Sequence, residues 1–337
     1  MEGIFLHTGW RSSGSWLWQR LRDQPGHMGF YEPLHEFLPI INQVQLAELS
    51  PQSWASRHGA TIVPYFAEYA PLLRPDGQGV RLAQKRFAFS QFFLNAAAQD
   101  EALAAYFTQL VGLARERGRL PVFKCTRSQG RLPWFRTQFP HWRHVALIRQ
   151  PWTQFRSAWR CHAQDGNKYF LAAPFLVLER NTGHRDVGAL AQGFGLPLGW
   201  GRYLPLNIRL KGWKLAVQVL DAGTLYKAHF ALWLLNTLAA CGAADMVLDG
   251  DAPPATLAGA FGLEAGRGTR PVFTPPPHWP ELTAAAVQRI HETGLRTLAY
   301  RINPAMAARL RLWLGEAETV AARDLCEAPQ AAAVFMG

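Results

Sequence analysis

One N-terminal segment has the residue types and the order of an anion-binding loop. Apolar residues 4–7 predict a buried strand, and Trp16 begins the apolar face of a predicted helix that Ser15 would cap. Gly9 and Gly14 permit a sharp backbone turn between the strand and the helix. A strand, loop and helix in this order direct backbone N–H groups and a helix dipole at one point, so the segment predicts a site for a phosphate-like group.

The cation of this loop is an arginine, whereas a Walker A motif carries a lysine. The loop lacks the Gly-Lys-Ser/Thr ending of that motif, and Arg11 precedes Gly14. This argues against an ordinary nucleoside triphosphatase. A plain turn between strand and helix stays open as an alternative, because such turns are common. The residues predicted to surround the anion are Arg11, Ser12, Ser13, Gly14, Ser15 and Trp16.

A second candidate anion site follows the predicted strand over 143–148. Arg149 comes directly after this strand, and Pro151 occupies the first position of the predicted helix that follows. Ser157 lies in the second turn of that helix. The fork of a guanidinium and the hydroxyl of a serine suit one phosphate group, so these two residues predict a second phosphate contact.

Strands and helices alternate along the chain, which predicts an α/β fold with a central parallel sheet. Two further strands are predicted over 121–126 and 244–248. Ligand groups of such a sheet lie at the carboxyl ends of its strands. Four cations lie at or just after the ends of three predicted strands and are expected to converge on one site: Arg11, Lys124, Arg127 and Arg149.

The other segments are less regular. Residues 87–117 have helical periodicity with an interruption near 99–100, where Asp100 is a suitable N-cap. Residues 39–80 are punctuated by prolines, and residues 168–212 are predicted to be loop-rich because of their glycines. We expect one domain over 1–325, with acceptor-binding insertions at 39–118 and 165–215 and a C-terminal tail over 326–337.

Four short segments together resemble the sulfotransferases that use 3′-phosphoadenosine 5′-phosphosulfate (PAPS). In pattern they are closest to the Golgi-type carbohydrate sulfotransferases and their bacterial relatives. The segments are Arg11-Ser-Ser-Gly-Ser-Trp16, Tyr31-Glu-Pro-Leu34, Lys124-Cys-Thr-Arg127 and the stretch from Arg149 to Ser157. They cover the first half of the chain. Two departures are Gln150, where the family has an acidic residue, and a glycine of the first loop that is displaced by one position.

The resemblance implies a P-loop-like three-layer fold, with helices on both sides of the parallel sheet and with loop-rich and helical insertions. It implies PAPS as the sulfuryl donor and requires no metal. The loop around Arg11 would hold the 5′-phosphosulfate, and Arg149 with Ser157 would hold the 3′-phosphate. Lys124 and Arg127 would also contact the cofactor. Arg267 and Arg270 belong to a basic loop that is expected to close over the nucleotide, although a plain solvated loop fits these residues equally well.

Sulfuryl transfer needs positive charge at the leaving group and a base for the acceptor proton. Arg11 is expected to supply the charge. Glu32 is the first choice for the base, because the Glu-Pro segment lies beside the nucleotide loop in related enzymes. His35 is the alternative, because an unperturbed imidazole titrates near neutral pH. The expected acceptor is a hydroxyl or amine of a carbohydrate-like compound.

Composition limits the other possibilities. The chain has 337 residues, of which 49% are hydrophobic, so it is long enough to bury a full core. No apolar stretch reaches the length of a membrane span and no leader pattern opens the chain, which predicts a soluble, cytoplasmic protein. The four cysteines form no C-x-x-C pair, which suits a reducing compartment and predicts no metal site.

The net charge of +11 is concentrated in one segment. Between Glu116 and Asp165 there are ten lysines and arginines and no acidic residue. Because these cations are spread over predicted strands and helices, we expect them to face an anionic ligand within the fold. A nucleic-acid-binding protein, a phosphoryl-transfer enzyme and a non-catalytic PAPS-binding relative stay open as alternatives.

Overall fold

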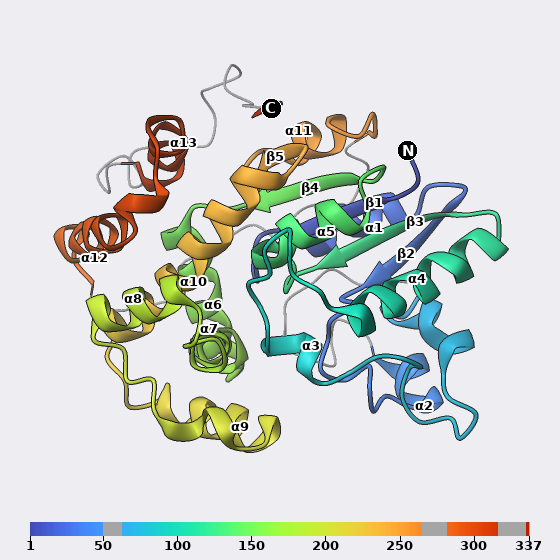
Figure 1. Cartoon of the computed structure of the whole chain (residues 1–337), viewed down its shortest axis with the longest axis horizontal. Helices are drawn as coiled ribbons and strands as arrows, with labels where there is room; N and C mark the ends of the chain where they lie inside the picture. The colour runs from blue at the N-terminus through green and yellow to red at the C-terminus, as the bar shows by residue number, and fades with distance from the viewer. Residues whose placement is uncertain (50–62, 265–281, 316–334, 337) are drawn as a thin grey trace.

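A parallel sheet forms the centre of the structure, a computed structural model that describes residues 1–49, 63–264, 282–315 and 335–336. Its strands are β1 (Ile4–Thr8), β2 (His27–Tyr31), β3 (Leu120–Cys125), β4 (Arg143–Ile148) and β5 (Met246–Asp249), with the short antiparallel β6 (Phe335–Met336) beside β5. The order is β2-β3-β1-β4-β5-β6 (Figure 1). The predicted α/β fold with a central parallel sheet is confirmed.

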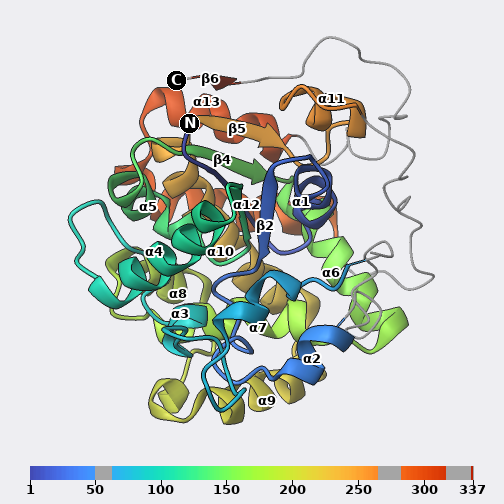
Figure 2. The same cartoon turned by 90° about the vertical axis from the view of Figure 1, so that its right-hand side faces the viewer.

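Helices cover both faces of this sheet. α1 (Gly14–Arg22) and α11 (Pro254–Gly259) lie on one face. α4 (Glu101–Glu116), α5 (Leu132–Gln138) and α10 (Ala222–Ala243) lie on the other, and Figure 2 shows the strands between α1 and the pair α4 and α5. This is the arrangement that right-handed crossovers between parallel strands produce, because α1 leads the chain one way along the sheet and the other helices lead it back.

The remaining helices extend the molecule on the side of β4 and β5. They are α6 (Pro151–Asp165), α7 (Tyr169–Arg180), α8 (Arg185–Phe194), α9 (Leu206–Ala216), α12 (Ala284–Thr297) and α13 (Pro304–Leu314). Short helices are α2 (Gln43–Glu48) and α3 (Arg86–Phe89), and 3-10 turns span Ala67–Leu72, Gln129–Arg131, Trp200–Tyr203 and Ala299–Arg301. We call α6 to α10 with α12 and α13 the helical lobe.

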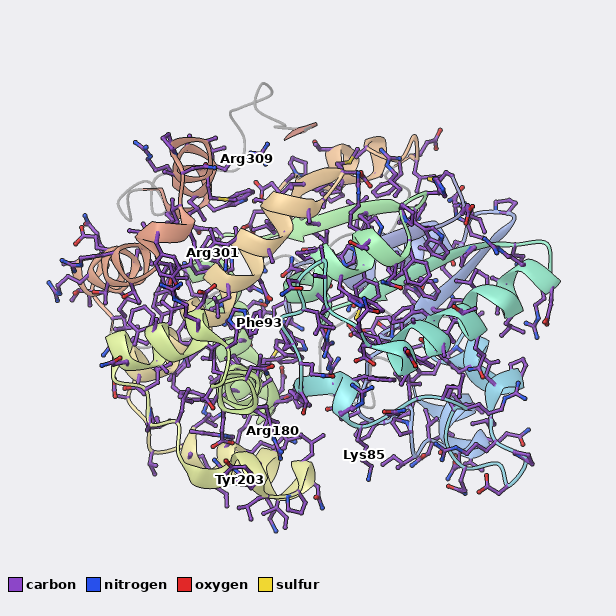
Figure 3. All side chains as sticks on the ribbon, in the orientation of Figure 1. Lys85, Phe93, Arg180, Tyr203, Arg301 and Arg309 are labelled. Carbon is purple, nitrogen blue, oxygen red and sulfur yellow. The ribbon has the colours of Figure 1, made fainter. Side chains whose placement is uncertain are left out.

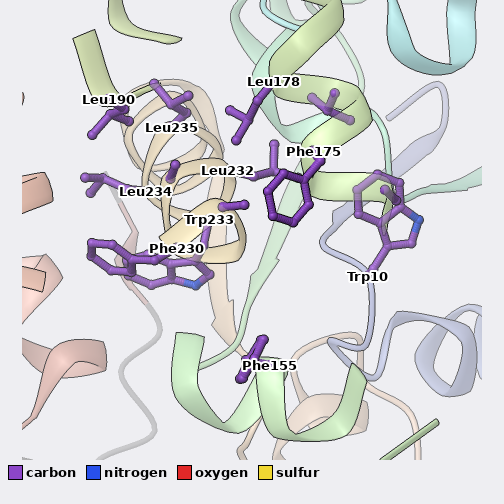
Figure 4. Packing of buried hydrophobic residues seen from close by; sticks show 14 of the residues in the cluster. Trp10, Phe155, Phe175, Leu178, Leu190, Phe230, Leu232, Trp233, Leu234 and Leu235 are labelled. Atoms are coloured by element: carbon purple, nitrogen blue, oxygen red, sulfur yellow. The ribbon is translucent and has the colours of Figure 1, made fainter. Parts of the chain in front are cut away.

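Two hydrophobic clusters meet at β4. Val145 and Leu147 belong to the cluster around the sheet, and Ala146 and Ile148 belong to the cluster of the helical lobe, because successive strand residues point to opposite faces. α10 is apolar on most sides and buries 15 residues at the centre of the lobe. Figure 4 shows part of this packing, with α10 residues such as Phe230 and Leu234 among the labelled side chains.

Arginines at the rim of the lobe hold its helices together. Arg301 forms an ion pair with the buried Asp186 of α8, and Arg309 of α13 donates to the carbonyl of Cys241 on α10 at 3.0 Å. Figure 3 labels both arginines, near the C-terminal helices drawn in orange and red. Within the described part of the chain, no helix is both long enough and apolar enough to cross a membrane.

The prediction of a loop-rich segment over 168–212 is wrong. Helices α7, α8 and α9 occupy most of it. The apolar run from Leu171 to Leu178 is entirely buried, and its packing outweighs the helix-breaking tendency of Pro174 within α7. Two of the glycines that suggested loops, Gly193 and Gly195, lie at the end of α8, where Gly195 is a left-handed C-cap.

The helical periodicity over 87–117 corresponds to two separate helices. α3 ends at Phe89 and α4 begins at Glu101, so residues 90–99 are not helical and the prediction is wrong there. Asp100 is the N-cap of α4, as predicted, and its carboxylate accepts from the backbone N–H of Leu103 at 3.0 Å.

Two histidines are buried inside the sheet. His7 on β1 and His144 on β4 lie 3.1 Å apart between their ring nitrogens, and His7 also bonds the hydroxyl of Ser128 at 2.8 Å. Burial lowers the pKa of His7 well below its usual range, and it lowers that of His144 to about 4. Both rings are therefore neutral in the folded protein at pH values where unfolded histidines carry a proton.

This pair predicts a loss of stability on mild acidification. As pH falls from about 6.5 toward 4, the unfolded chain takes up protons that the folded chain excludes, so the free energy of unfolding falls by up to about 1.4 kcal/mol per pH unit for each histidine. Urea titrations at several pH values between 6.5 and 4.5 measure this dependence. We expect the free energy of unfolding to fall less steeply with falling pH in the double variant His7→Leu/His144→Leu than in the unchanged protein. The exposed His141→Leu is the control, and an equal slope in all three proteins would contradict the assignment.

Candidate functional site

The loop between β1 and α1 is the first part of the site. Ser13 is the N-cap of α1, so the prediction that Ser15 caps this helix is wrong. The reason is the backbone of Ser13, whose φ of 67° turns the chain into the helix at Gly14. Ser15 lies inside the first turn, where its hydroxyl bonds that of Tyr31 at 3.0 Å.

Residues with side chains make this turn, although glycines were expected to make it. Arg11 and Ser13 have φ values of 64° and 67°, in the left-handed region that costs a non-glycine residue roughly 1–2 kcal/mol. Gly14 is needed for close packing, because a Cβ at this position would lie 2.5 Å from Cγ2 of Thr8. Backbone strain of this kind concentrates at functional sites, where the surrounding structure holds it in place.

The structure brings this loop together with the second predicted anion site. Nε of Arg11 donates to the hydroxyl of Ser157 on α6 at 3.1 Å, and Nη1 of Arg149 donates to the carbonyl of Arg11 at 3.0 Å. Burial lowers the pKa of Arg11, and the nearby charge of Arg149 lowers it further. An anion between these groups would offset the unfavourable burial of positive charge. We call Arg11, Arg149 and Ser157 the arginine pair site.

A carboxylate that the sequence analysis missed belongs to the same edge of the sheet. Asp251 follows β5, and its carboxylate accepts from Nε of Arg149 at 2.6 Å and from the backbone N–H of Gln150 at 3.2 Å. Gly250 beside it has no room for a side chain, because a Cβ would lie 2.9 Å from the carbonyl of Ser12. Asp251 lies three residues after the predicted strand over 244–248, and this place near a strand end was the signal that could have identified it.

The other predicted residues form a second, buried cluster. Glu32 forms ion pairs with Lys124 and with Nη1 of Arg127, the latter at 3.0 Å. Its carboxylate also accepts from the backbone N–H and the hydroxyl of Thr126 at 3.1 and 2.7 Å. Burial alone would raise the pKa of Glu32, but Lys124 and Arg127 outweigh it and lower the pKa. Glu32 is therefore ionised and already accepts four hydrogen bonds.

Glu36 completes the charge balance of this cluster. Nη2 of Arg127 pairs with Glu36 at 2.5 Å, and the hydroxyl of Tyr169 on α7 bonds the same carboxylate at 2.8 Å. Against the effect of burial, His35 and Arg127 lower the pKa of Glu36 to about 2. Burial lowers the pKa of His35 to about 4, so this imidazole is neutral at pH 7. Sequence analysis missed Glu36 and Tyr169, although Glu36 lies only four residues after Glu32.

The four cations expected to converge on one point form two adjacent groups, so the prediction of a single site is wrong. Lys124 and Arg127 are neutralised by Glu32 and Glu36, whereas Arg11 bonds Ser157 and Arg149 bonds the carbonyl of Arg11. Tyr31 lies between the groups: its hydroxyl bonds Ser15 of the loop, and its ring is 4.5 Å from Nζ of Lys124. The predicted cofactor contacts Arg267 and Arg270 lie outside the described residues.

No protein-family model, curated protein or solved structure matches this chain. Among the described residues, no group of three or more histidines, cysteines, aspartates or glutamates is arranged to hold a metal ion. The arrangement of the two groups is therefore the basis for any functional assignment.

The buried cluster predicts that the charge of Glu32 is needed for stability. The substitution Glu32→Gln leaves two buried cations with one fewer negative charge, and breaking a buried pair in this way costs about 3–5 kcal/mol. We expect chemical denaturation to show a loss of that size. The matched control is Glu2→Gln, which breaks the exposed pair with Arg115 and should cost less than about 1 kcal/mol. Similar losses in both variants would show that the cluster does not depend on this charge.

The loop predicts a specific requirement for glycine at position 14. Gly14→Ala places a methyl group into the side chain of Thr8 and should displace the loop, with a loss of about 1–3 kcal/mol in the free energy of unfolding. The control is Gly112→Ala in α4, where a Cβ meets no atom within 4 Å and alanine should stabilise the helix by about 0.5–1 kcal/mol. Thermal denaturation of both variants measures the difference, and a stabilised Gly14→Ala would contradict the predicted packing.

Proposed function

We propose that this protein is a PAPS-dependent sulfotransferase acting on a hydroxyl or amine of a carbohydrate-like acceptor. The observation that carries the proposal is the arginine pair site. Arg11 and Ser157 are 146 residues apart in the chain, yet they meet at the carboxyl edge of the sheet with Arg149. For these residues the family resemblance implies contacts with the phosphosulfate and with the 3′-phosphate.

The chemistry of the site fits a ligand with several negative charges. Two guanidinium groups and a hydroxyl are supplied by the side chains, and the N-terminal N–H groups of α1 add a positive dipole beside them. Arg11 is half-buried, so an anion that pairs with it is partly shielded from water and interacts with it more strongly than it would in bulk solvent. Arg149 forms its ion pair with Asp251, and a phosphate would share or replace this partner.

PAPS, when bound, supplies the sulfuryl group and a phosphate as leaving group. Arg11 would stabilise the negative charge that develops on the leaving group, and its fixed position makes this contribution large. Arginine cannot act as the proton donor near neutral pH, so its role is electrostatic. Ser12 and Ser13 hold the loop in place through bonds from their hydroxyls to the carbonyls of Gly9 at 2.7 Å and Gly250 at 3.2 Å.

Of the two predicted bases, the geometry favours His35 over Glu32. The carboxylate of Glu32 already accepts bonds from three residues, and its pKa is lowered, so it is a weak base. The neutral imidazole of His35 can accept a proton, and its pKa of about 4 would rise beside an added negative charge. Glu32 would then position Lys124 and Arg127.

The alternative of a nucleic-acid-binding protein loses its main support. Lys124, Arg127 and Arg131 are almost completely buried, and they are engaged by carboxylates or backbone carbonyls. Arg136 pairs with Asp245, and Arg149 pairs with Asp251. Half of the ten cations in the basic segment therefore bind partners within the chain. Nucleic-acid binding needs cations that face the phosphate backbone.

Calorimetric titration with 3′-phosphoadenosine 5′-phosphate, the desulfated product, tests the proposal. We expect binding that is tighter than that of ATP or AMP and that weakens at least about 100-fold in the double variant Arg149→Ala/Ser157→Ala, since each charge-assisted bond is worth about 1.5–3 kcal/mol. The control is Arg115→Ala, which removes an exposed arginine on α4. Equal binding of ATP, or no binding of the bisphosphate, would refute the proposal.

A further inference from the structure

A small pocket lies directly behind the loop that carries Arg11. Three helices of the lobe each contribute residues one or two turns apart, and so on one face: α6 with Gln154 and Ala158, α7 with Phe170 and Pro174, and α10 with His229, Leu232, Trp233 and Asn236. The loop closes it with Gly9, Trp10 and Arg11. Figure 4 shows Trp10 and the pair Leu232 and Trp233 within the same packed region.

Three buried polar atoms in this pocket are unsatisfied. Oε1 of Gln154, Nε2 of His229 and Oδ1 of Asn236 have no hydrogen-bond partner among the described residues. The three side chains are 6%, 7% and 5% exposed, so bulk water does not satisfy them. A buried polar atom without a partner costs roughly 1–3 kcal/mol, and three that line one pocket are unusual unless something binds there.

The tautomer of His229 follows from its other contact. This ring has a hydrogen bond with the backbone of Pro151, and proline has only a carbonyl to offer. Nδ1–H of His229 therefore donates a hydrogen bond to the carbonyl of Pro151, because Nε2 is the atom without a partner. Burial lowers the pKa of His229 to about 3, so the ring is neutral and Nε2 presents a lone pair to the pocket.

The pocket thus offers three hydrogen-bond acceptors, and its walls exclude two kinds of ligand. An anion would face the lone pairs of His229, Gln154 and Asn236. An ammonium group would face the guanidinium of Arg11, which lies 5.1 Å from the ring of Phe170 in the same pocket. A neutral hydroxyl donates to an acceptor without either repulsion. The walls of Trp10, Phe170 and Trp233 suit the C–H groups that accompany such a hydroxyl.

We infer that this pocket binds a hydroxymethyl-sized, neutral hydroxyl group, with Nε2 of His229 as its hydrogen-bond acceptor. The free space is small, so it admits one such group and not a whole sugar ring. Arg11 belongs both to this pocket and to the arginine pair site. We therefore assign this hydroxyl to the acceptor of the sulfuryl group, which makes the acceptor an alcohol. The assignment of the pocket to the acceptor rests on the proposed sulfotransferase activity.

The packing around the pocket keeps its acceptors in place. Nε2 of Gln154 donates to the carbonyl of Trp10, which turns Oε1 toward the pocket. The indole of Trp233 donates to the carbonyl of Arg149 at 2.8 Å. A Cβ on Gly9 would lie 2.6 Å from Nε2 of Gln154, so only glycine leaves room for this arrangement. The same contacts that position the phosphate-binding loop also position the pocket.

Nitrogen NMR of the full chain with ¹⁵N-labelled histidine tests the inference directly. The Nε2 resonance of His229 is assigned by its loss in His229→Phe, and the protein is titrated with methanol, glycerol and methylammonium. We expect methanol and glycerol to move this resonance upfield in a saturable manner, as an acceptor nitrogen does when it receives a hydrogen bond, and methylammonium to leave it unmoved. Asn236→Leu should weaken the response to methanol at least about fivefold, the effect of one lost neutral hydrogen bond.

Controls separate this result from loss of structure and from the proposed activity. His291→Phe makes the same substitution at a neighbouring half-buried histidine, bonded to Tyr226, that does not line the pocket, and it should keep the methanol response. Calorimetry with the bisphosphate is independent, because His229→Phe should still bind it. If no alcohol moves the resonance, the pocket holds only ordered water and the inference is wrong. If methylammonium moves it as far as methanol does, the pocket does not select a neutral hydroxyl and the proposed ligand class is wrong.

Discussion

The compensation of buried positive charge is the constraint on which the functional edge of this fold depends. Lys124 lies near the end of β3 and Arg127 follows it; they are 3% and 1% exposed, and an unpaired charge at such a place would cost several kcal/mol. Glu32 and Glu36, which follow β2, supply the two negative charges. The need for neutrality therefore fixes the end of β2 against the end of β3, and Tyr169 extends the same network to α7 in the helical lobe.

The loop after β1 lies between this neutral cluster and the helical lobe, and its conformation reflects both. Its left-handed residues, Arg11 and Ser13, are held by Ser157 on one side and by Gly250 on the other. The ring of Trp10 lies 5.6 Å from the guanidinium of Arg127 while it also belongs to the core of the lobe. Trp10 therefore contacts both the buried charges and the core of the lobe from within the loop.

Sequence reasoning succeeded where local chemistry decides the outcome. The strand over 143–148, the helix that begins at Pro151 and the cap at Asp100 are determined by residues within one turn of each other, and all three are present. The meeting of Arg11 with Arg149 followed from the rule that parallel strands align their carboxyl ends. The same rule did not predict that Lys124 and Arg127 form a group apart from Arg11 and Arg149, because their partner Glu36 and the contact from Tyr169 depend on tertiary packing.

The helices over 168–212 were missed for a similar reason. The burial of Phe175 and its neighbours against α10 depends on tertiary packing, which a local sequence pattern does not reveal.

On the proposed function, the ion pair of Arg149 with Asp251 would keep the site for a multiply charged anion in place before its ligand binds. Two arginines that share a partly buried edge repel each other, and without a counter-charge the side chain of Arg149 would turn toward water. Asp251 holds it in position through Nε, while Nη1 binds the carbonyl of Arg11 and keeps the loop in its strained form. A phosphate bound there would compete with the carboxylate of Asp251, which is 29% exposed at its side chain and can be rehydrated when displaced. On this proposal the ion pair would lower the affinity for the phosphate, but the two arginines would need little reorganisation, and fixed charges of this kind stabilise a transition state most effectively.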